Sequence, residues 1–220
     1  MQINLHIATD WSILEEMAQT NSFQSQRGRP RSFDMEVTVE RAMQVFWSRG
    51  YHGTSLPDLL GATRLSRGSL YAAFGDKHGL FLRALDRYID ESLARLDVEL
   101  NSQKSALGGL RACLAGYVDR TSGLGGKRGC LVVATAMELA AHDADVQKRI
   151  RWFFRAMEMR LTIAVTRAQG AGELVDHVEA PSIARLLVCA VEGLRVLGKT
   201  DLDKATWQSS VDLLLDRFIK

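Results

Sequence analysis

Small and basic side chains are concentrated in the stretch SRGSLYAAFGDK. Arg67, Gly68 and Ser69 follow one another, and Tyr71 comes next but one. An arginine can donate two hydrogen bonds to N7 and O6 of a guanine, and a serine can bind a base edge or a phosphate. A glycine lets the backbone approach DNA closely. These residues predict a DNA-reading surface; the alternative is that they are ordinary surface residues and helix caps.

Residues on either side extend the same chemistry. Lys77 is expected to open a helix, where its charge and the free N–H groups of the first turn favour a phosphate. Thr54 or Ser55 is expected to cap an earlier helix and to bind a phosphate in the same way. Arg64 can reach a phosphate from the turn between two short helices.

The segment RGRPR, residues 27–31, contains three arginines. It is either a solvated linker or a basic arm that touches phosphates or enters a minor groove. Residues 1–26 contain three carboxylates and no Lys or Arg, and they predict a loosely held tail with a short helix from Asp10. The candidate DNA-binding residues are Arg31, Thr54, Ser55, Arg64, Arg67, Gly68, Ser69, Tyr71 and Lys77.

Apolar residues at helical spacing predict the elements that hold these side chains. A packed helix is expected over about 34–49, and a short helix follows Thr54 or Ser55. A second short helix, capped by Ser66, buries Leu70 and Phe74. Two short helices joined by a tight turn and preceded by a packed helix form a helix-turn-helix unit.

Helical spacing continues through the rest of the chain, which predicts an all-α protein. A glycine-rich loop is expected over 121–129; it lacks the pattern of a phosphate-binding P-loop. The domain organisation expected is an N-terminal extension (1–32), a helix-turn-helix domain (33–78) and a ligand-binding and dimerisation domain (79–220). Further helices are expected over about 77–100, 104–121 and 130–141. A long helix is expected to follow residues 142–145 and to run to about 169, and two more are expected over 180–199 and 203–219.

The last two expected helices are apolar on most sides. In 180–199 the polar residues Arg185, Glu192, Arg195 and Lys199 form one narrow stripe. A helix apolar on most sides must be buried on most sides, either in a subunit interface or in one deep core of a monomer. The candidate interface residues are Leu187, Val191, Leu194, Val211, Leu214 and Phe218.

Composition excludes several classes of protein. The net charge of the 220 residues is only +2, so a nucleic-acid role must come from a local patch. Residues 27–80 supply one, with eight positive and five negative side chains. No apolar run is long enough for a membrane span, and no secretory signal is seen. No nucleophile–base pair, paired carboxylates or cofactor motif indicates an enzyme.

Cysteine and histidine spacing predicts neither a disulfide framework nor a metal site. Cys113, Cys130 and Cys189 are widely spaced, which fits a reducing cytoplasm. The five histidines make no ligand spacing. His142 with Asp143 and Asp145 is a weak metal candidate, and a loop with helix-capping carboxylates is the preferred interpretation. No cofactor is expected.

Residues 33–80 resemble the DNA-binding domain of the TetR family of transcriptional regulators. The likeness lies in AMQVFWSRGYHGTSLPDLL and LSRGSLYAAFGDKHGLF. The resemblance implies a cytoplasmic homodimer of about nine main helices per subunit. It also implies a palindromic double-stranded operator, a dimer interface made by the last two helices, and a small molecule that releases the DNA.

One departure from the family pattern concerns the turn between the short helices. The family commonly has glycine where Arg64 stands here. If Arg64 adopts the same positive φ, the conformation costs about 1 kcal/mol relative to glycine. A phosphate contact by Arg64 would offset that cost.

The effector site is expected among aromatic, methionine and cysteine side chains of the C-terminal domain, which also suit a plain core. Cys130 is expected to begin a helix after Lys127 and Arg128, a setting that lowers a thiol pKa and suits electrophile sensing. The alternative is a small buried residue. The candidates for the pocket are Tyr117, Cys130, Met137, Trp152, Phe153 and Met157.

These observations favour a homodimeric repressor released from a palindromic operator by a small apolar or electrophilic effector. The alternative is a DNA-binding regulator or architectural protein without a small-molecule switch. Sequence-specific DNA binding that a ligand abolishes would distinguish the first from the second.

Overall fold

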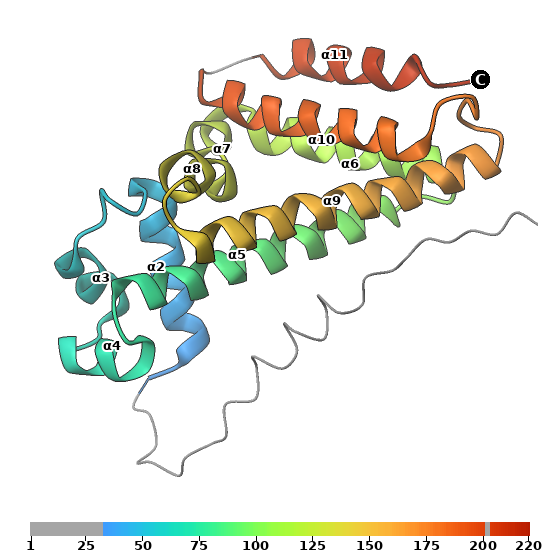
Figure 1. Ribbon diagram of the computed structural model, residues 1–220. Coiled ribbons are helices and arrows are strands. Elements are labelled where there is room, and N and C mark those ends of the chain that lie inside the picture. The colour runs from blue at the N-terminus through green and yellow to red at the C-terminus, as the bar shows by residue number, and fades with distance from the viewer. Residues whose placement is uncertain (1–32, 201–202) are drawn as a thin grey trace, which may run out of the picture. The chain divides into compact units, whose positions relative to one another are not determined.

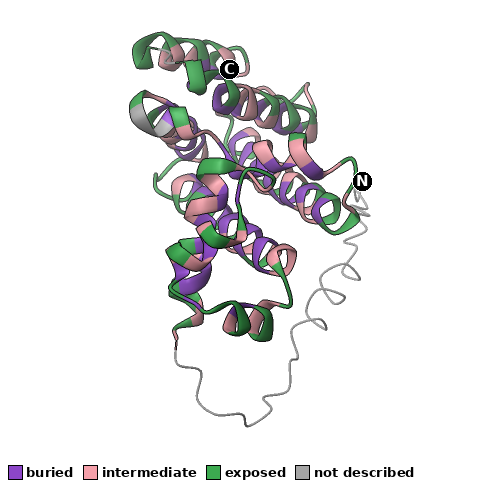
Figure 2. Ribbon diagram, turned by 90° about the vertical axis from the view of Figure 1, so that its left-hand side faces the viewer, coloured by how far each residue is buried: buried purple, intermediate pink, exposed green. Residues whose placement is uncertain are grey.

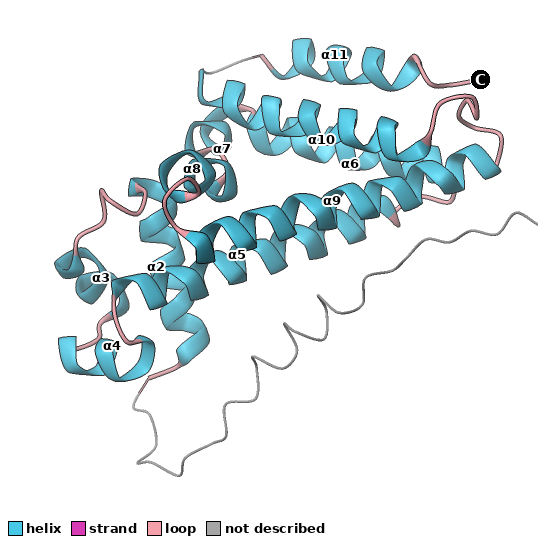
Figure 3. Ribbon diagram, in the orientation of Figure 1, coloured by secondary structure: helices cyan, strands magenta, loops and turns pink. Residues whose placement is uncertain are grey.

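The computed structural model describes residues 33–200 and 203–220. The predicted tail helix from Asp10, the arm at 27–31 and Arg31 lie outside the described residues. Within the described part, regular structure is helical, and strand-like pairing is limited to one isolated bridge between Leu174 and Ile219 (Figure 3). The all-α prediction is confirmed.

Nine helices of eight or more residues and one shorter helix occur in the described residues, close to the predicted ranges. They are α2 (Met35–Arg49), α3 (Leu56–Thr63), α4 (Arg67–Phe74), α5 (Lys77–Leu100), α6 (Ala106–Thr121), α7 (Gly123–Arg128), α8 (Leu131–Leu139), α9 (Ala144–Gly170), α10 (Ala180–Leu197) and α11 (Lys204–Asp216), with a 3₁₀ turn, η1 (Gly198–Thr200).

The helices of residues 35–220 form two connected groups (Figure 1). The first contains α2, α3 and α4, and α2 packs along the start of α5. The second contains α6 to α11, with α9 and α10 packed on α6 and α11 on the other side of α6. Because α5 runs without a break from the first group into the second, it joins them as a rigid element.

Caps fix the boundaries of the short helices. Ser55 and Asp58 form a reciprocal capping box at the start of α3. The Ser66 hydroxyl accepts a hydrogen bond from the Ser69 backbone N–H at 3.0 Å, and Asp76 caps α5 in the same manner through Gly79. The predicted cap at Ser66 is confirmed, and of the two candidates Thr54 and Ser55 the cap at α3 is Ser55.

Aromatic packing fastens α2 to α5. The Phe46 and Phe81 rings meet edge to face with centroids 5.0 Å apart, and both side chains are buried. Purple buried residues line the inward sides of both helix groups in Figure 2. This packing leaves α3 and α4 supported from one side only, so their other sides face solvent.

The predicted loop at 121–129 is wrong, because residues 123–128 form α7. A Cβ atom placed on Gly126 would lie 2.8 Å from the carbonyl oxygen of Gly198. The glycines therefore let α7 approach η1 closely, and this tertiary contact outweighs their low helix propensity.

Four predicted interface residues lie in the core of the single chain instead. Leu187, Val191, Leu194 and Val211 are at most 5% exposed, because α10 packs on α6 and α9 and α11 packs on α6. Leu214 and Phe218 are half-buried. The apolar side chains that α10 and α11 present to solvent are Leu186, Val196, Leu197 and Leu213.

Candidate nucleic-acid interface

The outer side of α4 is open to solvent. Leu70 is fully buried beneath the helix, whereas Arg67, Gly68 and Tyr71 are exposed. Ser69 is half-buried and its hydroxyl lies 2.9 Å from that of Ser66. The helix thus presents a guanidinium, bare backbone and a phenol on one side, which suits contact with base edges and phosphates.

The hydroxyl of Thr54 is not available to DNA, which corrects its assignment as a contact. Thr54 is fully buried and its Oγ1 donates to the Gly50 carbonyl at 2.6 Å. Ser55 is exposed, and its hydroxyl donates to Asp58 at 2.6 Å. The side chain of Asp58 also pairs with Arg49. These hydrogen bonds lower the pKa of Asp58 to about 2, those from Ser55 most strongly.

Arg64 occupies the turn between α3 and α4 with φ 59° and ψ 27°. This is the left-handed conformation in which glycine is favoured, so the predicted positive φ is confirmed. Within the described residues, Arg64 is the non-glycine residue with positive φ. The side chain is exposed, and it projects from the turn immediately before the cap of α4.

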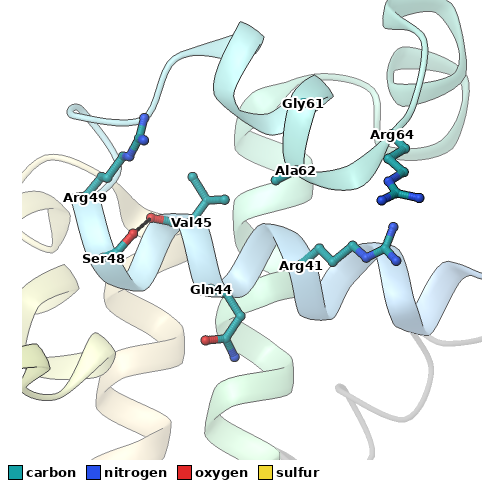
Figure 4. Close-up of a pocket in the computed structure, with 8 residues that line it drawn as sticks. All are labelled: Arg41, Gln44, Val45, Ser48, Arg49, Gly61, Ala62 and Arg64. Carbon is teal, nitrogen blue, oxygen red and sulfur yellow. Dashed lines mark hydrogen bonds between the residues drawn. The ribbon is translucent and has the colours of Figure 1, made fainter. Parts of the chain in front are cut away.

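Arg64 faces a second arginine across an open hollow between α2 and α3. Figure 4 shows the guanidinium groups of Arg41 and Arg64 pointing toward one another. The hollow has a volume of about 500 Å³. Sequence reasoning missed Arg41, because nothing in the pattern of α2 indicates which residue the end of α3 will face. The hollow is lined by Arg41, Gln44, Val45, Ser48, Arg49, Gly61, Ala62 and Arg64.

Lys77 is the first residue of α5, at the opposite end of α4. Its Nζ lies 4.3 Å from the centroid of the Tyr51 ring, a cation–π contact that holds the side chain beside the N-terminus of α5. Burial raises the pKa of Tyr51, as do the nearby carboxylates of Asp76, Asp143 and Glu138. The phenol therefore stays neutral.

A seam of polar contacts joins the first helix group to the second. Glu138 of α8 accepts hydrogen bonds from the backbone N–H groups of Tyr51 (2.9 Å) and His52 (2.6 Å). His78 Nε2 lies 2.7 Å from Asp143 Oδ2, and Asp143 also caps α9. Although its partial burial acts the other way, hydrogen bonds from Val146 and His78 lower the pKa of Asp143.

The predicted environment of Cys130 is wrong in one respect. Cys130 is the N-cap of α8, but it is only 2% exposed, and burial raises the pKa of its thiol. Arg128 stacks over the Trp47 ring at 3.8 Å instead of facing the sulfur. The cation that does face the sulfur is Arg195, whose Nη1 lies 2.7 Å from Sγ.

Cys130 belongs to a buried polar cluster that includes Glu192 and Arg195, two members of the polar stripe predicted on the helix over 180–199. Arg195 is 7% exposed, and its guanidinium lies 5.1 Å from the Tyr117 ring centroid. The Tyr88 hydroxyl donates to Cys130 Sγ at 3.6 Å. Both carboxylate oxygens of Glu192 are buried and have no hydrogen-bond partner among the described residues. The sequence signal that could have indicated this cluster is the pair of charged residues, Glu192 and Arg195, within an otherwise apolar helix.

The other pocket candidates are distributed between the core and the surface. Phe153 and Met157 are buried with Tyr117, and Trp152 is half-buried. Met137 is 86% exposed, which excludes it from a pocket inside the bundle. Among the described residues no cluster of metal-ligating side chains is present. None of the helices described combines the length and apolar content that crossing a bilayer requires.

Two family models match the chain. Residues 39–84 match the model described as bacterial regulatory proteins, tetR family. Residues 106–212 match the model described as tetracyclin repressor-like, C-terminal domain.

Individual proteins resemble the chain over most of its length. The HTH-type transcriptional repressor ComR of Escherichia coli (strain K12) is 30% identical over 178 residues, 80% of this chain and 85% of that protein. YezE, an HTH-type transcriptional regulator of Bacillus subtilis (strain 168), is 29% identical over 86% of this chain and 97% of its own. A cysteine mutant of the regulator CifR, solved with 26-base-pair operator DNA, has a TM-score of 0.76 and 30% identity, covering 87% of this chain and 100% of the CifR chain.

Proposed function

The chain belongs to the TetR family of bacterial transcriptional regulators, and from that premise we propose that it is a homodimeric repressor of a palindromic operator. One observation carries the proposal: the exposed, uncovered side of α4, where Arg67 and Gly68 lie opposite the buried Leu70. No carboxylate pairs with Arg67 among the described residues, so its guanidinium is available to a base edge or phosphate.

Two subunits are proposed because one short recognition helix reads only a half-site. The exposed apolar side chains of α10 and α11 support a dimer at that surface. The relatives solved with DNA are TetR-family regulators bound to operator duplexes, which supports the same role for this chain.

Release by a small molecule is proposed at the buried polar cluster of Tyr88, Tyr117, Cys130, Glu192 and Arg195. The Glu192 carboxylate has no hydrogen-bond partner among the described residues, and the Cys130 thiol contacts the Arg195 guanidinium. A small ligand or an electrophile would supply partners for these buried polar groups. The Glu138 and His78–Asp143 contacts supply a route by which movement of α8 and α9 reaches α2, α3 and α5.

The test measures binding to DNA from the protein's own promoter region by fluorescence anisotropy. Arg67→Ala is expected to weaken binding by at least tenfold, because one bidentate base contact contributes about 1–3 kcal/mol. Lys77→Ala is expected to reduce the salt dependence by about one phosphate's share per subunit.

Arg155→Ala is the matched control, because Arg155 is exposed on α9, away from the first helix group, and loses the same charge. Wild-type binding by both Arg67→Ala and Lys77→Ala would overturn the assignment. Binding that shows little sequence preference and no response to candidate effectors would favour the architectural alternative.

A further inference from the structure

We propose that the hollow between α2 and α3 is a phosphate-binding site, in which Arg41 and Arg64 together hold a backbone phosphate of the DNA. The site is additional to the contacts of α4 and Lys77. This inference rests on the proposed DNA-binding function, and it assigns Arg41 a role that no sequence pattern indicates.

The charges of this hollow are unbalanced. Several arginines elsewhere in the described residues have carboxylate partners, as Arg87, Arg149 and Arg160 do. No carboxylate pairs with Arg41 or Arg64 among the described residues, and both side chains are exposed. Two like charges that point toward one another repel unless an anion lies between them (Figure 4).

Arg49, at the other end of the hollow, provides an internal contrast. Its guanidinium is neutralised by Asp58, which is itself held by Ser55. The positive charge of the hollow is therefore confined to the end at Arg41 and Arg64. Small neighbours, Gly61 and Ala62, leave that end open, so an oxygen-rich anion can enter from solvent.

The backbone conformation of Arg64 supports the same assignment. Arg64 has a left-handed backbone two positions before Ser66, the cap of α4. A glycine would be unstrained in this conformation. An arginine there gains nothing from ion pairing within the described chain. Its benefit must come from a ligand, and a guanidinium fork matches the oxygens of a phosphate.

The position of the hollow indicates a DNA phosphate. Arg64 leaves the turn directly before α4, so when α4 enters a groove this turn lies near one bordering strand. Lys77 follows the other end of α4 and is placed to meet a different phosphate. An open hollow that two helices frame can accept a phosphate of a continuous duplex, whereas an enclosed cavity could not.

The experiment uses an operator duplex selected from random sequence by the full-length protein. A series of duplexes carries one neutral methylphosphonate at successive backbone positions. Wild-type protein is expected to lose about fivefold in affinity at one position in each half-site, and Arg41→Gln is expected to lose less than the wild type at that same position. The salt slope of Arg41→Gln on unmodified DNA should fall by about 0.9 per bound subunit.

Arg64→Gly separates binding from folding. This substitution relaxes the left-handed turn, so its melting temperature should rise while its operator affinity falls about fivefold. Arg155→Ala, which removes one charge from α9, should keep the wild-type methylphosphonate profile. Arg67→Ala should weaken binding to every duplex and retain the sensitivity at the Arg41 position.

Three results would overturn the inference or its premise. If Arg41→Gln and Arg64→Gly bind as the wild type does while Arg67→Ala is impaired, the phosphate site is refuted and the proposed function stands. If Arg67→Ala also binds normally, the proposed function itself fails. If sodium pyrophosphate raises the melting temperature of the wild type but not of Arg41→Gln, with DNA binding unchanged in that variant, the hollow serves a free phosphate compound and not DNA.

Discussion

At the scale of single residues, Glu192 is the least satisfied side chain of the C-terminal helices. It lies one turn before Arg195 on α10, and its carboxylate oxygens have no hydrogen-bond partner among the described residues. Burial raises the pKa of Glu192, and the nearby Arg195 opposes that shift. A buried carboxyl without partners destabilises the fold when it ionises, unless a ligand satisfies it.

Replacement of Glu192 by glutamine is expected to change the pH dependence of stability. The pKa of Glu192 is raised in the folded state. The contribution of Glu192 to the free energy of unfolding is therefore most favourable below the ordinary pKa of a glutamate, and it is lost as the pH rises through the pKa of Glu192 in the folded protein. The difference in free energy of unfolding should therefore shift in favour of Glu192→Gln as the pH rises above the ordinary pKa of a glutamate.

Urea denaturation of both proteins at several pH values measures this difference. Glu179→Gln is the control, since Glu179 is exposed at the start of α10 and makes no capping hydrogen bond through its side chain. A difference between Glu192→Gln and the wild type that does not vary with pH would contradict the buried, ionisable state described for Glu192.

At the scale of elements, α8 holds the turn between α2 and α3 through one side chain. Glu138 accepts two backbone N–H groups of that turn, and Gly50 packs directly against it. A Cβ on Gly50 would lie 2.9 Å from the Glu138 carboxylate, and its φ of 74° also favours glycine. Glu138 is thus one point at which α8 of the second helix group holds the helix-turn-helix unit.

Glu138→Gln is expected to lower the free energy of unfolding by about 1 kcal/mol, because its amide nitrogen replaces one acceptor and leaves a backbone N–H unpaired. Hydrogen exchange should become faster at the amides of Tyr51 or His52 and stay unchanged in α4. Glu158→Gln is the control, because it removes an exposed ion pair with Arg185 that contributes little. Unchanged exchange at residues 51 and 52 would show that the seam does not hold the turn.

At the scale of the whole molecule, the apolar surface of α10 and α11 is where we propose that two subunits meet. Leu186, Val196 and Leu197 of α10 are 42–51% exposed, and Leu213 of α11 is 57% exposed. Their spacing places the α10 residues on one side of the helix, opposite the residues that pack on α6 and α9. Burial of such a surface against its copy is favourable by about 25 cal/mol per Å².

Leu186→Asp is expected to convert the protein from dimer to monomer, because an aspartate at a buried interface loses its hydration without a partner. Sedimentation velocity measures the change, and the operator affinity should fall with it. Val98→Asp is the control, since Val98 is 70% exposed on α5. A Leu186→Asp protein that remains dimeric would exclude this surface as the interface.

The sequence by itself determined the helices and which side of α4 is exposed. The spacing of apolar residues predicted helices close to nearly all of those observed. Cap residues such as Ser55 and Ser66 predicted where the short helices begin. These features depend on interactions within a few residues, which is why local pattern sufficed. The same locality placed Arg67 and Gly68 opposite Leu70 on α4.

Only the tertiary structure decided which sides of those helices are covered. Leu186 and Leu187 are adjacent and equally apolar residues of α10, yet Leu187 packs on the bundle and Leu186 faces solvent. The pairing of Arg41 with Arg64 and of Cys130 with Arg195 joins residues that are distant in sequence. Helical periodicity gives the relative direction of side chains on one helix, but the neighbour that each meets depends on how the helices pack.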